Sequence, residues 1–223
     1  MDSIWTKTCS FPSFPALEGE HHTDVLIIGG GIAGLLCAYN LQKKGIDYMV
    51  VDASRILSGT TNGTTGKITA FHGLIYHKLK KSIGLEKAGL YLLANLSAVK
   101  TYQELCRNID CDWEEQNHYI YSLEEENMLE EELRDFTAFH YPNSKEICFW
   151  AAQDCMPLDS RPYIGPYASL APGIYVASGF QKWGMTSSLL AAGILTDHIL
   201  GKENPYSILF SPSRSILKPQ LFF

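Results

Sequence analysis

The stretch DVLIIGGGIAGLL, residues 24–36, constrains the fold of this chain more than any other. Its apolar residues are interrupted by three consecutive glycines. Such a pattern suits a membrane segment, a glycine-weakened core element, or the turn that receives the pyrophosphate of a dinucleotide. The membrane alternative fails on length, because the apolar run ends at Asn40 and is shorter than the about 20 residues a spanning helix needs.

The residues around the glycines predict a strand, a turn, a helix and a second strand. Val25–Ile28 is a continuous apolar run, typical of a strand buried on both faces. After the glycines, apolar residues recur at helical spacing as far as Lys44, and Gly45 is the expected stop. Tyr48–Val51 is the second strand, and the whole unit has the length of a βαβ crossover.

Each glycine of the turn has a predicted task. Gly29 makes the tight turn, Gly31 lets the backbone approach a pyrophosphate, and Gly34 lets the helix pack closely on the sheet. Asp52, at the end of the second strand, can accept hydrogen bonds from ribose hydroxyls and would repel a 2′-phosphate. The alternative that remains is a nucleotide fold that binds nothing.

The remainder of the chain alternates polar loops with helices and short strands. We expect a loop rich in Ser, Thr and Gly over 54–73, a helical pattern over 77–107 and an acidic helix face over 124–132. We expect short strands at 119–122, 147–151 and 174–177, and a final helix over 186–200 that Gly201 ends.

The first βαβ unit does not distinguish FAD from NAD, but two later segments favour FAD. The loop LSGTTNGTTGKITAFHG can cradle the rest of an extended cofactor soon after the second strand. Near the end of the chain, a strand, a glycine turn (Gly179, Gly184) and a helix recur. A helix N-terminus is a favourable neighbour for the flavin O2, which gathers negative charge on reduction.

These segments resemble the D-amino-acid-oxidase-like (DAO) FAD-dependent oxidoreductases. The closest similarity is to the branch that carries a C-terminal Rieske iron–sulfur domain, in SGTTNGTTGKITAFHGLIY, WAAQDCMPLDSRPYIG, GFQKWGMT and NPYSILFSPSR. The resemblance implies that Gly29, Gly31 and Gly34 hold the pyrophosphate of an FAD and that Asp52 holds its adenosine ribose. It also implies that the flavin is lined by Ser58, Thr60, Thr61, Thr65 and Lys67 and faced by Gly184, Met185 and Thr186.

Plainer explanations exist for several of these residues. The Ser and Thr residues could belong to a polar surface loop, and Met185 and Trp183 could be core. His72 lies in the flavin-side loop but is expected to be structural or exposed, so no catalytic residue is assigned. The six cysteines have no metal-ligand spacing and are expected to be buried or free thiols, and no metal site is predicted.

The sequence departs from the family pattern in two places. Family members have a segment as large as a second domain between the regions that match NHYIYSLEEE and WAAQD, and this segment is absent. The sequence also stops before the Rieske domain would follow, and no CxH…CxxH pattern occurs.

We expect an α/β fold, a Rossmann-like FAD/NAD(P)-binding domain with a central parallel sheet and the substrate-binding domain largely absent. Residues 1–223 form one FAD-binding domain, in which 76–147 is a helical insertion replacing most of the substrate domain.

Two functions follow as hypotheses. The first is an FAD-dependent oxidoreductase that takes hydride from a small C–H donor, an amine or an amino-acid-like molecule, at flavin N5. The second is a shortened FAD-binding module with little or no catalysis; an NAD-binding protein is disfavoured.

The formal charge of −6 argues against nucleic acid, no signal peptide or membrane span is read, and the expected location is cytoplasmic. Self-association or a redox partner is a further hypothesis, because the missing domain would leave apolar surface exposed.

Overall fold

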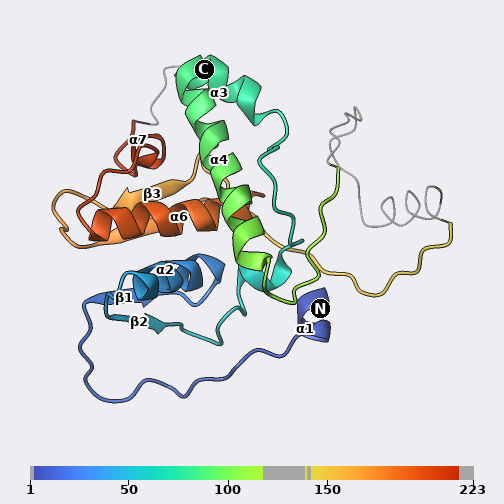
Figure 1. Cartoon of the computed structure of the whole chain (residues 1–223), viewed down its shortest axis with the longest axis horizontal. Coiled ribbons are helices and arrows are strands. Elements are labelled where there is room, and N and C mark those ends of the chain that lie inside the picture. The colour runs from blue at the N-terminus through green and yellow to red at the C-terminus, as the bar shows by residue number, and fades with distance from the viewer. Residues whose placement is uncertain (1–2, 118–138, 140–141, 216–223) are drawn as a thin grey trace.

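The computed structural model describes residues 3–117, 139 and 142–215. In chain order its elements are α1 (Ile4–Thr8), β1 (Val25–Ile28), α2 (Ile32–Lys43), β2 (Tyr48–Val51), the short 3₁₀ helix η1 (Thr60–Gly63), α3 (Ile75–Ile83), α4 (Leu85–Cys106), β3 (Tyr163–Pro166), β4 (Tyr175–Ser178), α6 (Gly184–Ile199) and α7 (Ser207–Phe210). Figure 1 shows α2 and α6 side by side, with α4 crossing near one end of α6.

The predicted βαβ unit is confirmed. Strands β1 and β2 pair in parallel, with Val25 opposite Tyr48 and Ile28 opposite Val51. Helix α2 connects them, and Gly45, the predicted stop, has a φ of +69°. This conformation suits glycine because an L side chain rarely adopts it.

The C-terminal part forms a second unit. Strands β3 and β4 pair antiparallel, and α6 follows β4 after a glycine turn. The predicted strand at 174–177 and the predicted final helix are confirmed to within two residues. Among the described residues the parallel pairing is limited to β1 and β2, so only this part of the expected central parallel sheet is observed.

One further predicted element is wrong, and two lie outside the described residues. The predicted strand at 147–151 is wrong, because these residues have no regular structure. Instead, the indole N–H of Trp150 donates to the carbonyl oxygen of Gly63 at 3.0 Å. This bond ties the segment to the Ser-, Thr- and Gly-rich loop of residues 54–73 (the polar loop). The expected strand at 119–122 and the acidic helix at 124–132 lie outside the described residues.

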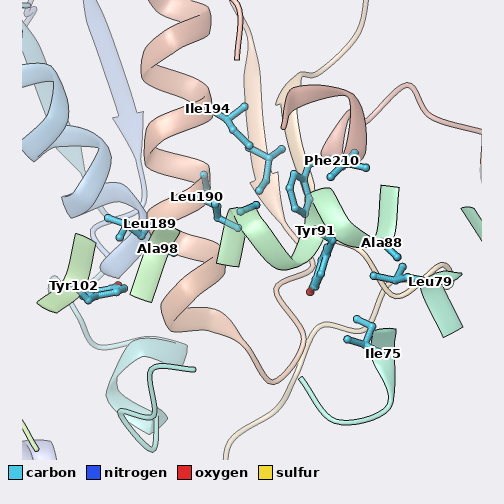
Figure 2. Close-up of a cluster of buried hydrophobic side chains, with 14 residues drawn as sticks. Ile75, Leu79, Ala88, Tyr91, Ala98, Tyr102, Leu189, Leu190, Ile194 and Phe210 are labelled. Carbon is cyan, nitrogen blue, oxygen red and sulfur yellow. The ribbon is translucent and has the colours of Figure 1, made fainter. Parts of the chain in front are cut away.

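The predicted helical pattern over 77–107 is confirmed as two helices. Gly84, with a φ of +89°, separates α3 from α4. Figure 2 shows side chains from α3, α4, α6 and α7 converging in one buried cluster. Its fully or nearly buried members are Ile75, Leu79, Ala88, Tyr91, Ala94, Ala98, Tyr102, Ile164, Leu189, Leu190, Ala191, Ile194, Leu209 and Phe210.

The expectation that β1 is buried on both faces is wrong. Helix α2 packs against the strand, whose burial alternates along the chain. On the other face, Leu26 is 53% exposed and Ile28 is 83% exposed. A strand that is apolar on both sides is suited to burial between two layers. Here only one side is covered, and the apolar side chains of Leu26 and Ile28 are left exposed.

A buried ionic cluster joins the LDSRPYIG segment to the C-terminal residues. Arg214 donates to both carboxylate oxygens of Asp159, at 2.7 and 3.0 Å, and Arg161 donates to one of them at 2.8 Å. Arg214 also donates to the carbonyl oxygens of Pro162 and Phe210. The three ionic side chains are 7–9% exposed, so this cluster fixes β3 and α7 relative to each other.

Over the described residues, no helix combines the length and the apolar character that crossing a membrane requires.

Candidate functional site

Glycine is required at the first residue of the turn between β1 and α2 and again within the first turn of α2. Gly29 has a φ of +114°, in the region that L side chains rarely adopt. A Cβ on Gly34 would lie only 1.9 Å from the carbonyl oxygen of Gly29. The first turn of α2 therefore approaches the end of β1 more closely than any residue with a side chain would permit.

The middle glycine, Gly30, is held from both sides, a role that the sequence did not predict. Its N–H donates to Oδ2 of Asp52 at 2.7 Å, and its carbonyl oxygen accepts from the N–H of Leu57 at 2.9 Å. A Cβ on Gly30 would meet the side chain of Ile56 at 2.8 Å. The available signal was the glycine at position 30, because the GxGxxG motif allows any residue between its first two glycines.

Asp52 anchors the turn through its carboxylate. Oδ1 accepts from the N–H of Ser54 at 2.8 Å, in addition to the contact of Oδ2 with Gly30. These two backbone hydrogen bonds hold the pKa of the Asp52 carboxyl below its usual value. The side chain is exposed, so its remaining lone pairs can accept hydrogen bonds from a ribose.

The polar loop reaches the start of α2. Oγ1 of Thr61 accepts a hydrogen bond from the N–H of Ile32 at 3.0 Å and would lie 3.2 Å from a Cβ on Gly31. Gly31 is the N-cap of α2 and has no capping side chain of its own. Thr61 therefore supplies the cap from another part of the chain.

A cavity of about 770 Å³ lies beside this helix start. Its wall includes Ile32 at the start of α2, Leu57 and the polar loop, Tyr102 of α4 and Met185 at the start of α6. Segments far apart in the chain thus meet around one space, and the volume is in the range of small-molecule and cofactor sites.

The cavity separates the expected site residues into two groups. Thr61, Thr65, Lys67 and Met185 line it. The other expected site residues do not: they are Gly29, Gly31, Gly34, Asp52, Ser58, Thr60, Gly184 and Thr186. Gly31 directly precedes Ile32, which lines the cavity, whereas Ser58 and Thr60 are exposed and Thr186 is buried.

His72 is a structural residue, as expected. It is 3% exposed, and its ring stacks on Trp183 at 4.3 Å between ring centroids with 6° between the planes. Nε2 lies 2.9 Å from the carbonyl oxygen of Thr69, so this nitrogen carries the proton, and Nδ1 accepts from the Tyr91 hydroxyl at 2.9 Å. The Thr186 hydroxyl lies 3.4 Å from Nε2. This network joins the polar loop to α4 and α6 instead of presenting a base to a substrate.

Tyr102 is a further cavity residue, and it was not among the residues predicted from the sequence. Its hydroxyl donates to the carbonyl oxygen of Met185 at 3.1 Å, across 83 positions of the sequence. This bond connects α4 to the first turn of α6 at the cavity wall. Tyr102 matched the apolar stripe of a helix, and nothing in that pattern distinguishes a core tyrosine from one at a cavity.

The residues present fit an FAD. The turn carries no side chains at the start of α2, since a Cβ on Gly30 or Gly34 would collide with Ile56 or with the carbonyl oxygen of Gly29, and Ile32 at this helix start lines the cavity. The cavity wall combines apolar surface, at Ile32 and Met185, with the hydroxyls of Thr61 and Thr65 and the cation of Lys67. Such a mixture suits a flat apolar ring system with polar edges.

Comparison with known proteins points to one family. The family model described as FAD dependent oxidoreductase (DAO) matches residues 24–147, more than half of the chain. The Rieske 2Fe-2S iron–sulfur protein YhfW of Bacillus subtilis is 24% identical, over 99% of this chain and 77% of that protein. A D-amino acid dehydrogenase of Helicobacter pylori is 46% identical over 22% of this chain and 12% of that protein. The gamma-glutamylputrescine oxidoreductase of Escherichia coli is 28% identical over 46% of this chain and 25% of that protein. No solved structure matches.

The alignment with YhfW also contains a large gap. It extends over 391 positions, although this chain has 223 residues. Much of the aligned part of YhfW therefore has no counterpart here. The matched part of the chain spans only 12% of the length of the D-amino acid dehydrogenase and 25% of the length of the gamma-glutamylputrescine oxidoreductase.

Proposed function

This chain belongs to the DAO family of FAD-dependent oxidoreductases, and we propose that it oxidises a small donor, an amine or an amino-acid-like molecule. FAD, when bound, would supply the redox chemistry as the acceptor, at N5, of a hydride from the donor's C–H bond. The protein's part is to bind and orient the cofactor and to exclude water from the ring.

The cofactor contacts divide between the two βα units. Gly29, Gly31 and Gly34 let the pyrophosphate approach the N-terminus of α2, and Asp52 accepts hydrogen bonds from the ribose. Of the residues expected around the flavin, Thr61, Thr65, Lys67 and Met185 line the cavity and would contact the ring there. Ser58, Thr60, Gly184 and Thr186 lie outside the cavity lining, and their contact with the flavin rests on the family resemblance alone.

The cavity beside α2 is the observation that carries this proposal. Thr61, Thr65 and Lys67 line it together with Met185, and Ile32 connects it to the glycine turn. A polar surface loop would not need to meet the start of two helices from opposite ends of the chain. A cofactor that contacts both helix N-termini does need this arrangement.

A second candidate is an FAD-binding module with little or no catalysis. Two observations favour it: the gap in the alignment with YhfW and the exposed face of β1 at Leu26 and Ile28. In this proposal residues 1–223 form one FAD-binding domain, and 76–147 replaces most of the domain that would cover the flavin. An uncovered flavin binds but does not position a donor.

A visible spectrum of the purified protein separates the candidates. The protein is reconstituted with FAD and then mixed without oxygen with a panel of primary amines, secondary amines and D- and L-amino acids. Flavin bands that bleach with one class of donor support the oxidoreductase. Bound flavin that dithionite bleaches and no donor does supports the binding module. Protein that retains no FAD after gel filtration contradicts both.

A matched pair of variants tests whether FAD retention depends on an intact glycine turn. Gly34→Ala removes the close approach of α2 to β1 and is expected to abolish FAD retention. Gly89→Ala, at a helical position with open space around it, is expected to retain FAD as the unchanged protein does.

A further inference from the structure

Two cysteine residues flank the chain reversal where α4 ends. Cys106 is the last residue of α4, and Cys111 follows after a short reversal of the chain in which the N–H of Ile109 donates to the carbonyl oxygen of Cys106 at 3.1 Å. Asp112 has a φ of +49°, a conformation rare for a residue with a side chain, and it directs the chain onward from Cys111. The reversal thus returns Cys111 to the end of the helix.

The two side chains also share their surroundings. Both line the cavity of about 770 Å³, and both line a neighbouring hollow of about 600 Å³. Burial raises the pKa of the Cys106 thiol, and a hydrogen bond and charge interaction with the Cys111 thiol raise it further. The smaller hollow is formed entirely by residues between Gln103 and Trp113, so the two cysteines border the same local space at the chain reversal.

Access to the two thiols is unequal. Cys111 is exposed, whereas Cys106 is partly buried, and all six cysteines of the chain are free thiols. In thiol–disulfide exchange, the accessible thiolate attacks first and a neighbouring thiol then displaces the leaving group. An exposed thiol beside a partly buried one is the arrangement that this two-step exchange uses.

We propose that Cys106 and Cys111 form a reversible disulfide at the cavity wall, made by exchange with a low-molecular-weight disulfide. The Cys111 thiolate attacks the external disulfide, forms a mixed disulfide and releases one thiol. The Cys106 thiolate then attacks the sulfur of Cys111 and releases the second thiol. The external disulfide is reduced to two thiols, and the two cysteines are oxidised to one disulfide.

The position of the pair gives the bond a consequence for the cavity. Cys106 lies one helical turn beyond Tyr102, whose hydroxyl holds the carbonyl oxygen of Met185. Trp113, two residues after Cys111, lines both hollows. A disulfide fixes the end of α4 to the segment that carries Trp113, so it rigidifies the wall between the two spaces.

The test is a redox titration with glutathione that follows each thiol. The protein is equilibrated at a series of ratios of oxidised to reduced glutathione, quenched with N-ethylmaleimide and mapped by mass spectrometry. We expect Cys106 and Cys111 to lose alkylation together, to appear as one internally linked species, and to recover with dithiothreitol. Cys9, which lines the same cavity, and the exposed Cys155 serve as internal references.

Single variants distinguish the internal bond from simple glutathione addition. In Cys106→Ser, Cys111 is expected to accumulate the glutathione adduct, since no neighbouring thiol displaces it. In Cys9→Ser the internal bond is expected to form as in the unchanged protein. A stable glutathione adduct on Cys111 of the unchanged protein, or a bond between Cys111 and Cys9, would overturn the proposal. Each readout is independent of bound FAD, so the outcome does not depend on the proposed function.

Discussion

Oγ1 of Thr61 accepts a hydrogen bond from the backbone N–H of Ile32 at 3.0 Å, so a threonine of the polar loop caps the first turn of α2. The two residues belong to the two parts of the chain that the sequence assigns to pyrophosphate and flavin. Their contact shows that these parts form one continuous structure around the helix start. It also makes Thr61 a positioning residue for α2 in the protein without its cofactor.

Replacing Thr61 tests this cap. Thr61→Val keeps the shape of the side chain and removes the acceptor, so we expect the free energy of unfolding to fall by about 1 kcal/mol. Thr61→Ser keeps the acceptor and should lie close to the unchanged protein. Urea denaturation of the cofactor-free protein measures both. Equal stability of the Val and Ser variants would show that the cap contributes nothing.

Gly34 tests the close approach of helix and strand. Gly34→Ala places a Cβ on the carbonyl oxygen of Gly29, and because both atoms belong to the backbone framework neither can yield cheaply. We expect a loss of at least about 3 kcal/mol of stability. Gly89→Ala is the control in α4, where it should add roughly 0.5–1 kcal/mol. Thermal and urea unfolding give the comparison, and a Gly34→Ala protein of unchanged stability would contradict the close contact between α2 and the end of β1.

His72 tests whether the network around it is structural. His72→Phe preserves an aromatic ring against Trp183 but removes the partners of the Thr69 carbonyl and the Tyr91 hydroxyl. We expect a loss of about 2–4 kcal/mol, since two buried hydrogen bonds disappear. Tyr91→Phe removes one of them and should cost about half as much. Equilibrium unfolding without cofactor isolates this effect from any role in a reaction.

The Asp159 cluster predicts a dependence of stability on pH. Burial alone would raise the pKa of Asp159, but the guanidinium groups of Arg214 and Arg161 outweigh it, so the folded pKa lies below the ordinary 3.8. The carboxylate therefore stabilises the fold above pH 3.8, and its contribution is lost as the pH falls through the lower folded value.

Asp159→Asn provides the measurement for that dependence. At pH 7 the variant is expected to be about 3–5 kcal/mol less stable, because two buried cations lose their counter-ion. The difference from the unchanged protein should shrink as the pH falls below about 4. Urea titrations between pH 7 and pH 3 follow both proteins. A difference that stays constant over this range would show that the cluster does not titrate as described.

The local elements were largely predictable. The two wrong predictions, the strand at 147–151 and the burial of β1 on both faces, have the same cause: an apolar run does not show what it pairs with or what covers it. Both strands of the βαβ unit, the helix between them and its stop at Gly45 agree with the structure. The strand expected at 147–151 is absent because side-chain contacts such as that of Trp150 with Gly63 replace a strand partner. The exposed Ile28 has the same origin: apolar character predicts the need for a covering layer but does not show that the layer is present.

The glycine turn was predictable from the sequence alone, because backbone conformation and the absence of a Cβ are local properties that a few residues specify. The family was predictable too, because the resemblance rests on short local motifs that are read directly from the sequence. Three arrangements emerged only from the folded chain: Thr61 caps α2, His72 is locked between Trp183 and Tyr91, and Cys106 and Cys111 line the same two hollows. The contacts of Thr61 and His72 join segments that lie far apart in the sequence, so they depend on packing, which is a property of the whole chain that no single segment encodes.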